Sequence, residues 1–163
     1  MRLKRRFQSA LTGGREFSEA LLAGFKTPEQ WTYQVHPKAN HALWFAGHIG
    51  VIENFMISLL APEKGDEKAG YPETFGLGSM PIGDPAKYPP VEEVLAYMRE
   101  RREVLLGVLD GLSDEDFDTP TPDEAPKFLP TYGSIFQLAA IHEAFHIGQV
   151  SVAARALGMP PRI

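Results

Sequence analysis

Apolar residues recur at helical spacing in four long stretches of the chain. In residues 40 to 60 two apolar stripes interleave, which predicts a helix that is buried on most sides. Residues 90 to 112 carry an apolar face opposite a run of Glu and Arg, which we expect to be exposed to solvent. The last stretch begins near Thr131 and ends at Gly158. The first covers residues 4 to 25, and its large apolar side chains are Phe7, Leu11, Phe17, Leu21 and Phe25.

The segments between these stretches lack a sustained period. Residues 61 to 90 are rich in glycine and proline and predict a long connection, which we expect to form a rim or lid over one end of a bundle. Residues 113 to 130 predict a proline- and acid-rich linker, and Thr27 with Gln30 predicts a short capped turn. Four principal helices without a convincing strand indicate an all-α four-helix bundle with a long loop after the second main helix. We expect one domain, residues 1–163, whose topology the helical period does not determine.

Composition places the chain among ordinary globular proteins, with 44% hydrophobic and 23% charged residues. The formal net charge of -5 does not favour a nucleic-acid partner. The basic start, Arg2 to Arg6, is typical of a solvated first helical turn. No uninterrupted apolar run approaches the ~20 residues that cross a membrane, and the N-terminus lacks an apolar signal core. We therefore expect a cytoplasmic protein with neither a nucleic-acid nor a membrane partner.

The stretch IHEAFHIGQ, residues 141 to 149, contains the string H-E-x-x-H. His142 and His146 are four residues apart and therefore project from one face of a helix, which suits two ligands of one metal ion. Two partly buried core histidines would give the same pattern, so the pair alone does not decide between them. The chain contains no cysteine, so nitrogen and oxygen atoms must bind any metal.

Two well-known kinds of metal site need more than this string. A zinc peptidase would need Glu143 as a general base and a third protein ligand further along the chain, but no His, Asp or Glu follows His146. The extended peptidase motif also fails, since Gln149 and Val152 occupy its glycine and third-histidine positions. Glu143 is then interpreted as an ordinary residue on the flank of the helix. A di-iron bundle would need a second Glu-x-x-His element, and none of the other three histidines has a glutamate three residues before it.

A third ligand must therefore come from an earlier helix, and His48 is the natural candidate. It lies in the middle of a mostly apolar helix, where an unpartnered polar ring would be costly. His41, two turns earlier, competes with it but lies near the helix start, where solvent or capping can satisfy its ring. Gln149 shares the face of the histidine pair, where it would orient a ligand or form a hydrogen bond between helices. Asn40 and His41 would line the mouth of the site, and Trp44 would form its apolar wall or else belong to the core.

The segments NHALWFAGHIG, residues 40 to 50, and IHEAFHIGQVSVAARALG, residues 141 to 158, resemble the DinB-like (DinB/YfiT) superfamily of metal-dependent proteins. The resemblance covers nearly the whole chain, including the long loop after the second helix. It implies a four-helix bundle in which His48, His142 and His146 bind a divalent metal ion near one end. It also implies a homodimer, and members with known activities include thiol-dependent transferases and a thiol-dependent isomerase.

Three neutral imidazoles would leave a divalent ion its full charge and open positions, so that a bound water or thiol would lose its proton more easily. We therefore expect a metal-dependent enzyme, either a thiol-dependent transferase or a hydrolase. It would act on an unidentified small molecule, with a low-molecular-weight thiol as a second substrate. Imidazole suits zinc, nickel and iron alike, and we expect zinc or nickel. The alternative is a non-catalytic bundle that is stabilised by metal or that self-associates.

Overall fold

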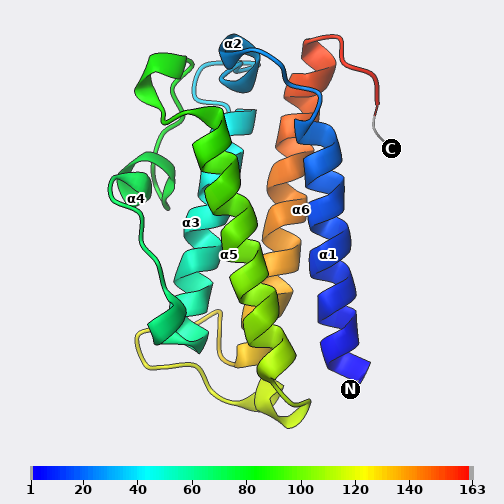
Figure 1. The fold of residues 1–163 in the computed structure, drawn as a ribbon, viewed down its shortest axis with the longest axis vertical. Helices are drawn as coiled ribbons and strands as arrows, with labels where there is room; N and C mark the ends of the chain where they lie inside the picture. Colours follow the sequence, from blue (N-terminus) through cyan, green and yellow to red (C-terminus); the bar gives the residue numbers. More distant parts are fainter. Residues whose placement is uncertain (1, 162–163) are drawn as a thin grey trace.

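In a computed structural model, which describes residues 2–161, the chain folds into a bundle of four long helices (Figure 1). Residues 2–161 contain no strand, and Pro120 and Thr131 form only an isolated bridge. The predicted all-α class and the approximate positions of the four helices are confirmed. The four helices are α1 (Arg2–Leu22), α3 (Ala42–Leu60), α5 (Val91–Gly111) and α6 (Tyr132–Ala156).

The four helices form a ring in which α1 and α6 run in one direction and α3 and α5 run in the other (Figure 1). α3 packs on α5 and α6, and α1 packs on the same two helices from the opposite side. Because α3 and α5 are parallel neighbours, the chain must return along the length of the bundle between them. Residues 61–90 make this return, which explains why a long connection follows the second main helix.

The long connection is more regular than its composition indicated. It contains α4 (Tyr71–Phe75) and two short 3₁₀ turns, Pro62–Lys64 and Pro85–Lys87. α4 packs against the side of α3, where a Cβ atom on Gly47 would lie only 2.3 Å from the ring of the buried Phe75. This part of the connection is therefore a side wall of the bundle and not the lid over one end that we expected.

Side-chain caps determine where several helices begin. The predicted capping box at α2 (Pro28–Trp31) is confirmed, because Thr27 and Gln30 exchange side-chain hydrogen bonds with each other's backbone. The side chain of His41 caps α3, and the hydroxyl of Thr131 caps α6. These caps determine the register of the two helices that carry the histidines.

α3 is the most apolar helix of the bundle and lies in its core. By length and composition alone it could cross a membrane, but 72% of the apolar window is buried inside the protein. The helices bury two apolar clusters, one toward each end of the bundle. The burial of α3 is therefore that of a core helix, as the two interleaved apolar stripes predicted.

Candidate metal centre

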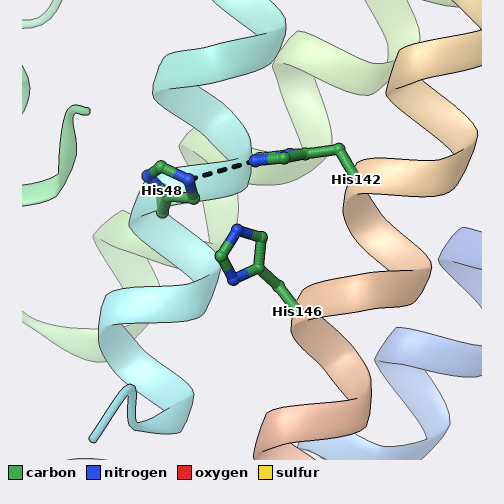
Figure 2. A group of neighbouring side chains, drawn as sticks. All are labelled: His48, His142 and His146. Carbon is green, nitrogen blue, oxygen red and sulfur yellow. Dashed lines mark hydrogen bonds between the residues drawn. The ribbon is translucent and has the colours of Figure 1, made fainter. Parts of the chain in front are cut away.

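His48 of α3 lies beside His142 and His146 of α6 (Figure 2). Each residue offers one ring nitrogen, and the three nitrogens lie within 4.8 Å of one another. His48 is buried, and the other two rings are partly exposed. The three residues meet because α3 and α6 are antiparallel neighbours and because a spacing of four places both α6 histidines on the face toward α3.

Hydrogen bonds at the opposite ring nitrogens orient two of the three imidazoles. Nδ1 of His48 lies 2.6 Å from the carbonyl oxygen of Phe75, and Nδ1 of His146 lies 3.0 Å from Oε1 of Gln149. Because these oxygens can only accept, both Nδ1 atoms carry the proton and both Nε2 atoms present a free lone pair. Metal-binding histidines are generally oriented by such bonds to their other nitrogen.

The spacing of one pair of nitrogens matches neighbouring ligands of one metal ion. Nε2 of His48 and Nε2 of His142 are 3.2 Å apart, and two ligands at ~2.0–2.1 Å from a tetrahedral zinc ion are about 3.4 Å apart. Three protein ligands leave one tetrahedral position open, which is typical of catalytic zinc sites, whereas structural sites use four. The donor atoms therefore suit a divalent ion with an accessible position, and any pair of nitrogens near the 4.8 Å limit has to move closer to share that ion.

Burial keeps the three rings uncharged at neutral pH. The pKa of His48 is lowered to about 4 and the pKa of His142 to about 3, chiefly by desolvation and in smaller part by the neighbouring histidines. The hydrogen bond from His48 to the carbonyl of Phe75 acts in the opposite direction. Desolvation also lowers the pKa of His146, although its hydrogen bond to Gln149 acts in the opposite direction. Neutral imidazole is the form that binds metal, so the cluster needs to lose no proton before binding at pH 7.

Three further residues from the predicted site lie beside the histidines. The indole of Trp44 stacks on His48, with ring centroids 4.3 Å apart and planes at 13°. Nδ2 of Asn40 donates to Oε1 of Gln149 at 2.8 Å, the same oxygen that accepts from His146. Trp44 therefore covers one side of the cluster, and Asn40 helps to hold the amide that orients His146.

His41 does not join the cluster, so the prediction that it lines the mouth of the site is wrong. Its ring is fully buried, and Nδ1 accepts a hydrogen bond from the backbone N–H of Trp44 at 3.1 Å. Nε2 lies 3.1 Å from the carbonyl oxygen of Ile82 and 3.1 Å from the hydroxyl of Tyr88. Capping α3 directs the ring toward the long connection and leaves no ring nitrogen for a metal.

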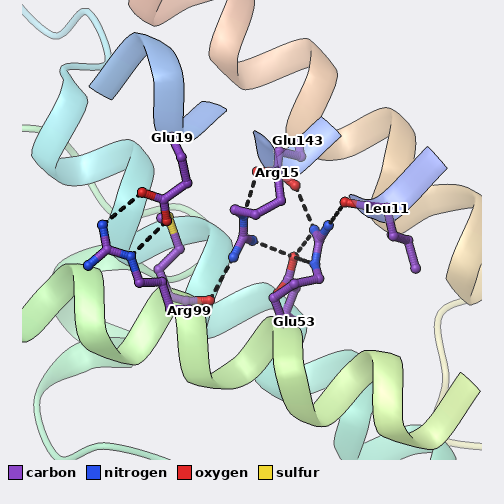
Figure 3. A network of polar contacts seen from close by, with 8 residues as sticks. Leu11, Arg15, Glu19, Glu53, Arg99 and Glu143 are labelled. Atoms are coloured by element: carbon purple, nitrogen blue, oxygen red, sulfur yellow. Dashed lines mark hydrogen bonds and ion pairs between the residues drawn. The ribbon is translucent and has the colours of Figure 1, made fainter. Parts of the chain in front are cut away.

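Glu143 is bonded to two arginines in the bundle interior (Figure 3). Its Oε1 accepts from Nε of Arg15 at 2.8 Å, and its Oε2 accepts from Nη2 of Arg102 at 2.6 Å. Glu143 is 1% exposed, so the interpretation as an ordinary flank residue is wrong. Its exclusion as a peptidase base is supported, since its carboxylate is not part of the metal-competent group.

Glu143 belongs to a charged layer that we define as Arg15, Glu53, Arg102 and Glu143. One member comes from each long helix, and the layer lies between the two apolar clusters of the core. Burial opposes charge on Arg102 and Glu143, but their ion pairs outweigh it, raising the pKa of Arg102 and lowering that of Glu143. Arg101 and Arg102 are each only 3% exposed, which contradicts the prediction that the whole Glu/Arg run of α5 faces solvent.

A family model described as the DinB superfamily matches residues 10–150, a range that includes all three histidines. The chain belongs to the DinB superfamily. The resemblance inferred from the two histidine segments is thereby confirmed. No curated protein and no solved structure gives a significant match. Membership of the DinB superfamily establishes the relationship, whereas the reaction depends on the residues of the site itself.

Proposed function

We propose that this DinB superfamily protein is a metal-dependent enzyme whose His48, His142 and His146 hold a divalent ion, zinc or nickel. The observation that supports this most directly is that three ring nitrogens from two helices lie within 4.8 Å of one another. A divalent ion at such a site lowers the pKa of a thiol or water at its open position and so supplies a nucleophile at neutral pH. The reaction class would be thiol-dependent transfer or hydrolysis.

The surrounding residues have defined tasks in this proposal. The carbonyl of Phe75 and the amide of Gln149 keep the Nδ1 protons in place, so that the lone pairs of Nε2 face the ion. Trp44 excludes water from the side of His48 on which it stacks. The chain has no cysteine, so a reacting thiol must come from a small molecule. A hollow of about 350 Å³ lies beside Asn40 and Gln149, the pair that holds His146 in place, and offers room for such a co-substrate next to the cluster, although none of the three histidines lines it.

Metal binding is the first test. We expect purified, chelator-treated protein to take up one Zn²⁺ or Ni²⁺ per chain in isothermal titration calorimetry. His142→Ala should abolish this uptake, whereas His36→Ala, which removes an exposed histidine outside the cluster, should leave it unchanged. Equal loss in both variants, or no uptake by the native protein, would contradict the proposed site.

Turnover is the second test, and it separates an enzyme from an inert metal protein. Apo protein should be inactive in a panel of thiol-conjugation, ester-hydrolysis and amide-hydrolysis assays, and added metal should restore activity to the native chain but not to His142→Ala. Stoichiometric metal binding without any metal-dependent turnover would favour the non-catalytic alternative.

An exposed apolar face of α6 favours self-association, either of a non-catalytic bundle or of a dimeric enzyme. Ile141, Phe145 and Val152 of α6 are 57%, 64% and 54% exposed, and their spacing places them on one face of the helix. A second copy of the chain could cover this face around a two-fold axis, with the same stripe on each copy. We expect sedimentation velocity to show a homodimer that Ile141→Glu converts to monomer. A monomeric native protein would contradict self-association.

A further inference from the structure

A groove with mainly apolar walls adjoins the histidine cluster on the side of His142. Its volume is about 690 Å³, which lies within the range of small-molecule sites, ~300–1,000 Å³. His142 itself is part of its lining, so a molecule in the groove touches one of the three candidate ligands. The principal apolar residues of the groove are Val51, Ile52, Phe55, Leu77, Phe128 and Leu138.

The groove is linked to the histidine cluster in a second way, through the backbone. Gly76 lines the groove, and the residue before it, Phe75, supplies the carbonyl that accepts the hydrogen bond from His48. The segment that orients His48 therefore continues directly into the wall of the groove. Contacts on this wall and the position of the His48 ring are linked through one peptide unit.

Several polar side chains that line the groove form hydrogen bonds within the protein. The hydroxyl of Ser58 donates to the carbonyl of Asn54, and the hydroxyl of Tyr97 donates to the carbonyl of Asp66. Oδ1 of Asn54 accepts from the backbone N–H of Asp66 and from Arg101. These groups are therefore not aimed at a ligand, and recognition along this part of the groove rests on apolar contact.

The shape and exposure of the groove indicate what fills it. Leu77 and Phe128 are 93% and 70% exposed, whereas Met56 and Leu129 in the same lining are 1% and 2% exposed. The groove is thus a recess with apolar residues from its interior to its mouth, and it is not a flat patch. A recess of this kind fits a chain or a ring system, which gains free energy by leaving water.

We infer that the groove binds the apolar body of the substrate, an acyl or alkyl chain or an aromatic ring system, and places its polar reactive group at His48, His142 and His146. This inference rests on the proposed function, because it assigns the substrate class of the same site. It divides the site into an apolar recess and a metal-binding head region. A second protein copy in the groove is the competing occupant.

Alkyl hydroxamates test this arrangement, because the hydroxamate group binds divalent metals and the chain length can be varied without changing the head. The probes are acetohydroxamate, hexanohydroxamate and decanohydroxamate, titrated into the Zn²⁺-loaded protein by calorimetry. Burial of each methylene is worth about 0.8 kcal/mol, so Kd should fall by about three- to fourfold per methylene until the chain fills the groove.

Groove variants make the result specific. Phe55→Gln and Phe128→Gln place polar groups on the wall at exposed positions, where the fold should tolerate them. We expect each substitution to weaken the binding of decanohydroxamate at least about tenfold and to leave the affinity for acetohydroxamate unchanged. Leu3→Gln is the matched control, since Leu3 is 41% exposed, close to the 42% of Phe55, but lies outside the groove. It should alter neither affinity.

The possible failures are distinguishable. Equal affinities for all three hydroxamates on metal-loaded protein would overturn the substrate assignment and leave the metal-dependent function standing. Absence of Zn²⁺ uptake in a titration without hydroxamate would overturn both. If the chain length has no effect and Phe55→Gln or Phe128→Gln converts a dimer to monomer in sedimentation, the groove is an interface between copies and the inference is wrong.

Discussion

Nε of Arg15 donates to Oε1 of Glu143 across 2.8 Å, although Glu143 stands inside an H-E-x-x-H string. Adjacent residues of a helix point about 100° apart, so the face that carries His142 and His146 toward α3 cannot also carry Glu143. The intervening glutamate is used in the core, where it balances the charge of two arginines. The string therefore describes two candidate metal ligands and a core ion pair and does not describe a peptidase.

Glu143→Gln should lower the free energy of unfolding by about 3–5 kcal/mol, because it leaves two buried arginines, Arg15 and Arg102, with Glu53 as their one remaining carboxylate in the charged layer. The Zn²⁺ stoichiometry should remain unchanged, since the cluster keeps its three histidines. Urea unfolding and metal titration measure the two quantities. The control is Glu19→Gln, which removes the charge and one acceptor oxygen from an exposed pair with Arg99, whose hydrogen bonds are 2.8 and 2.7 Å, and should cost less than about 1 kcal/mol. Unchanged stability together with loss of a metal-dependent peptidase activity would restore Glu143 as a base.

The helices and the histidine cluster could be predicted because both depend on short-range periodicity. Apolar residues every three to four positions mark a helix, and a spacing of four puts His142 and His146 on one face whatever the rest of the chain does. His48 could be selected because a polar ring in an apolar helix needs a partner. The directions of the helices could not be predicted, since periodicity carries no information about which neighbours are parallel.

The charged layer shows what local pattern cannot supply. Arg102 sits in a run of Glu and Arg that resembles any solvated helix face, and its partners Glu53 and Glu143 lie 49 and 41 residues away. A carboxylate inside an otherwise apolar helix, Glu53, indicates a buried ion pair. The sequence does not show which residues are its partners. For His41 the sequence offered both capping and a place at the mouth of the site, because both roles put the residue at the same position of a helix. The structure shows the cap.

Gln149→Leu should weaken Zn²⁺ binding by about 10- to 100-fold, the usual effect of losing the partner that orients a ligating histidine. The leucine cannot accept the hydrogen bond from Nδ1 of His146, so the imidazole ring then adopts other orientations and tautomers. Gln149→Glu retains an acceptor and should retain the affinity. Gln137→Leu, an exposed glutamine on the same helix, is the control. Equal affinities for Gln149→Leu and the native protein would show that this hydrogen bond does not position His146.

Gly47→Ala should destabilise the protein by about 1–3 kcal/mol, the usual cost of overpacking a core. The new methyl group would lie 2.3 Å from the ring of Phe75, and displacing Phe75 would also move the carbonyl that accepts from His48. Weaker Zn²⁺ binding should therefore accompany the loss of stability. Gly107→Ala on α5 has no atom within 4 Å of the added methyl and should stabilise by about 0.5–1 kcal/mol. Similar effects of the two substitutions on unfolding would contradict the close packing of α4 on α3.

His41 should make the folded protein less stable in acid. Burial lowers its pKa to about 4, against hydrogen bonds to the backbone of Ile82 and Trp31 that raise it, whereas the unfolded value is near 6.5. The unfolded chain therefore binds the extra proton between these two values. The contribution of His41 is fully present above about pH 6.5 and decreases as the pH falls toward 4, with about 2 kcal/mol lost at pH 5.

His41→Asn tests this, because asparagine caps a helix well but does not titrate in this range. The metal-site histidines also have lowered pKa values, so the informative quantity is the difference between the native and variant proteins. In urea unfolding of apo protein with a chelator present, the free energy of unfolding should fall by about 2 kcal/mol more for the native chain than for the variant between pH 7 and pH 5. Parallel pH profiles would mean that the His41 ring is already protonated in the fold or is accessible to water, and either result contradicts its position as a neutral, buried cap of α3.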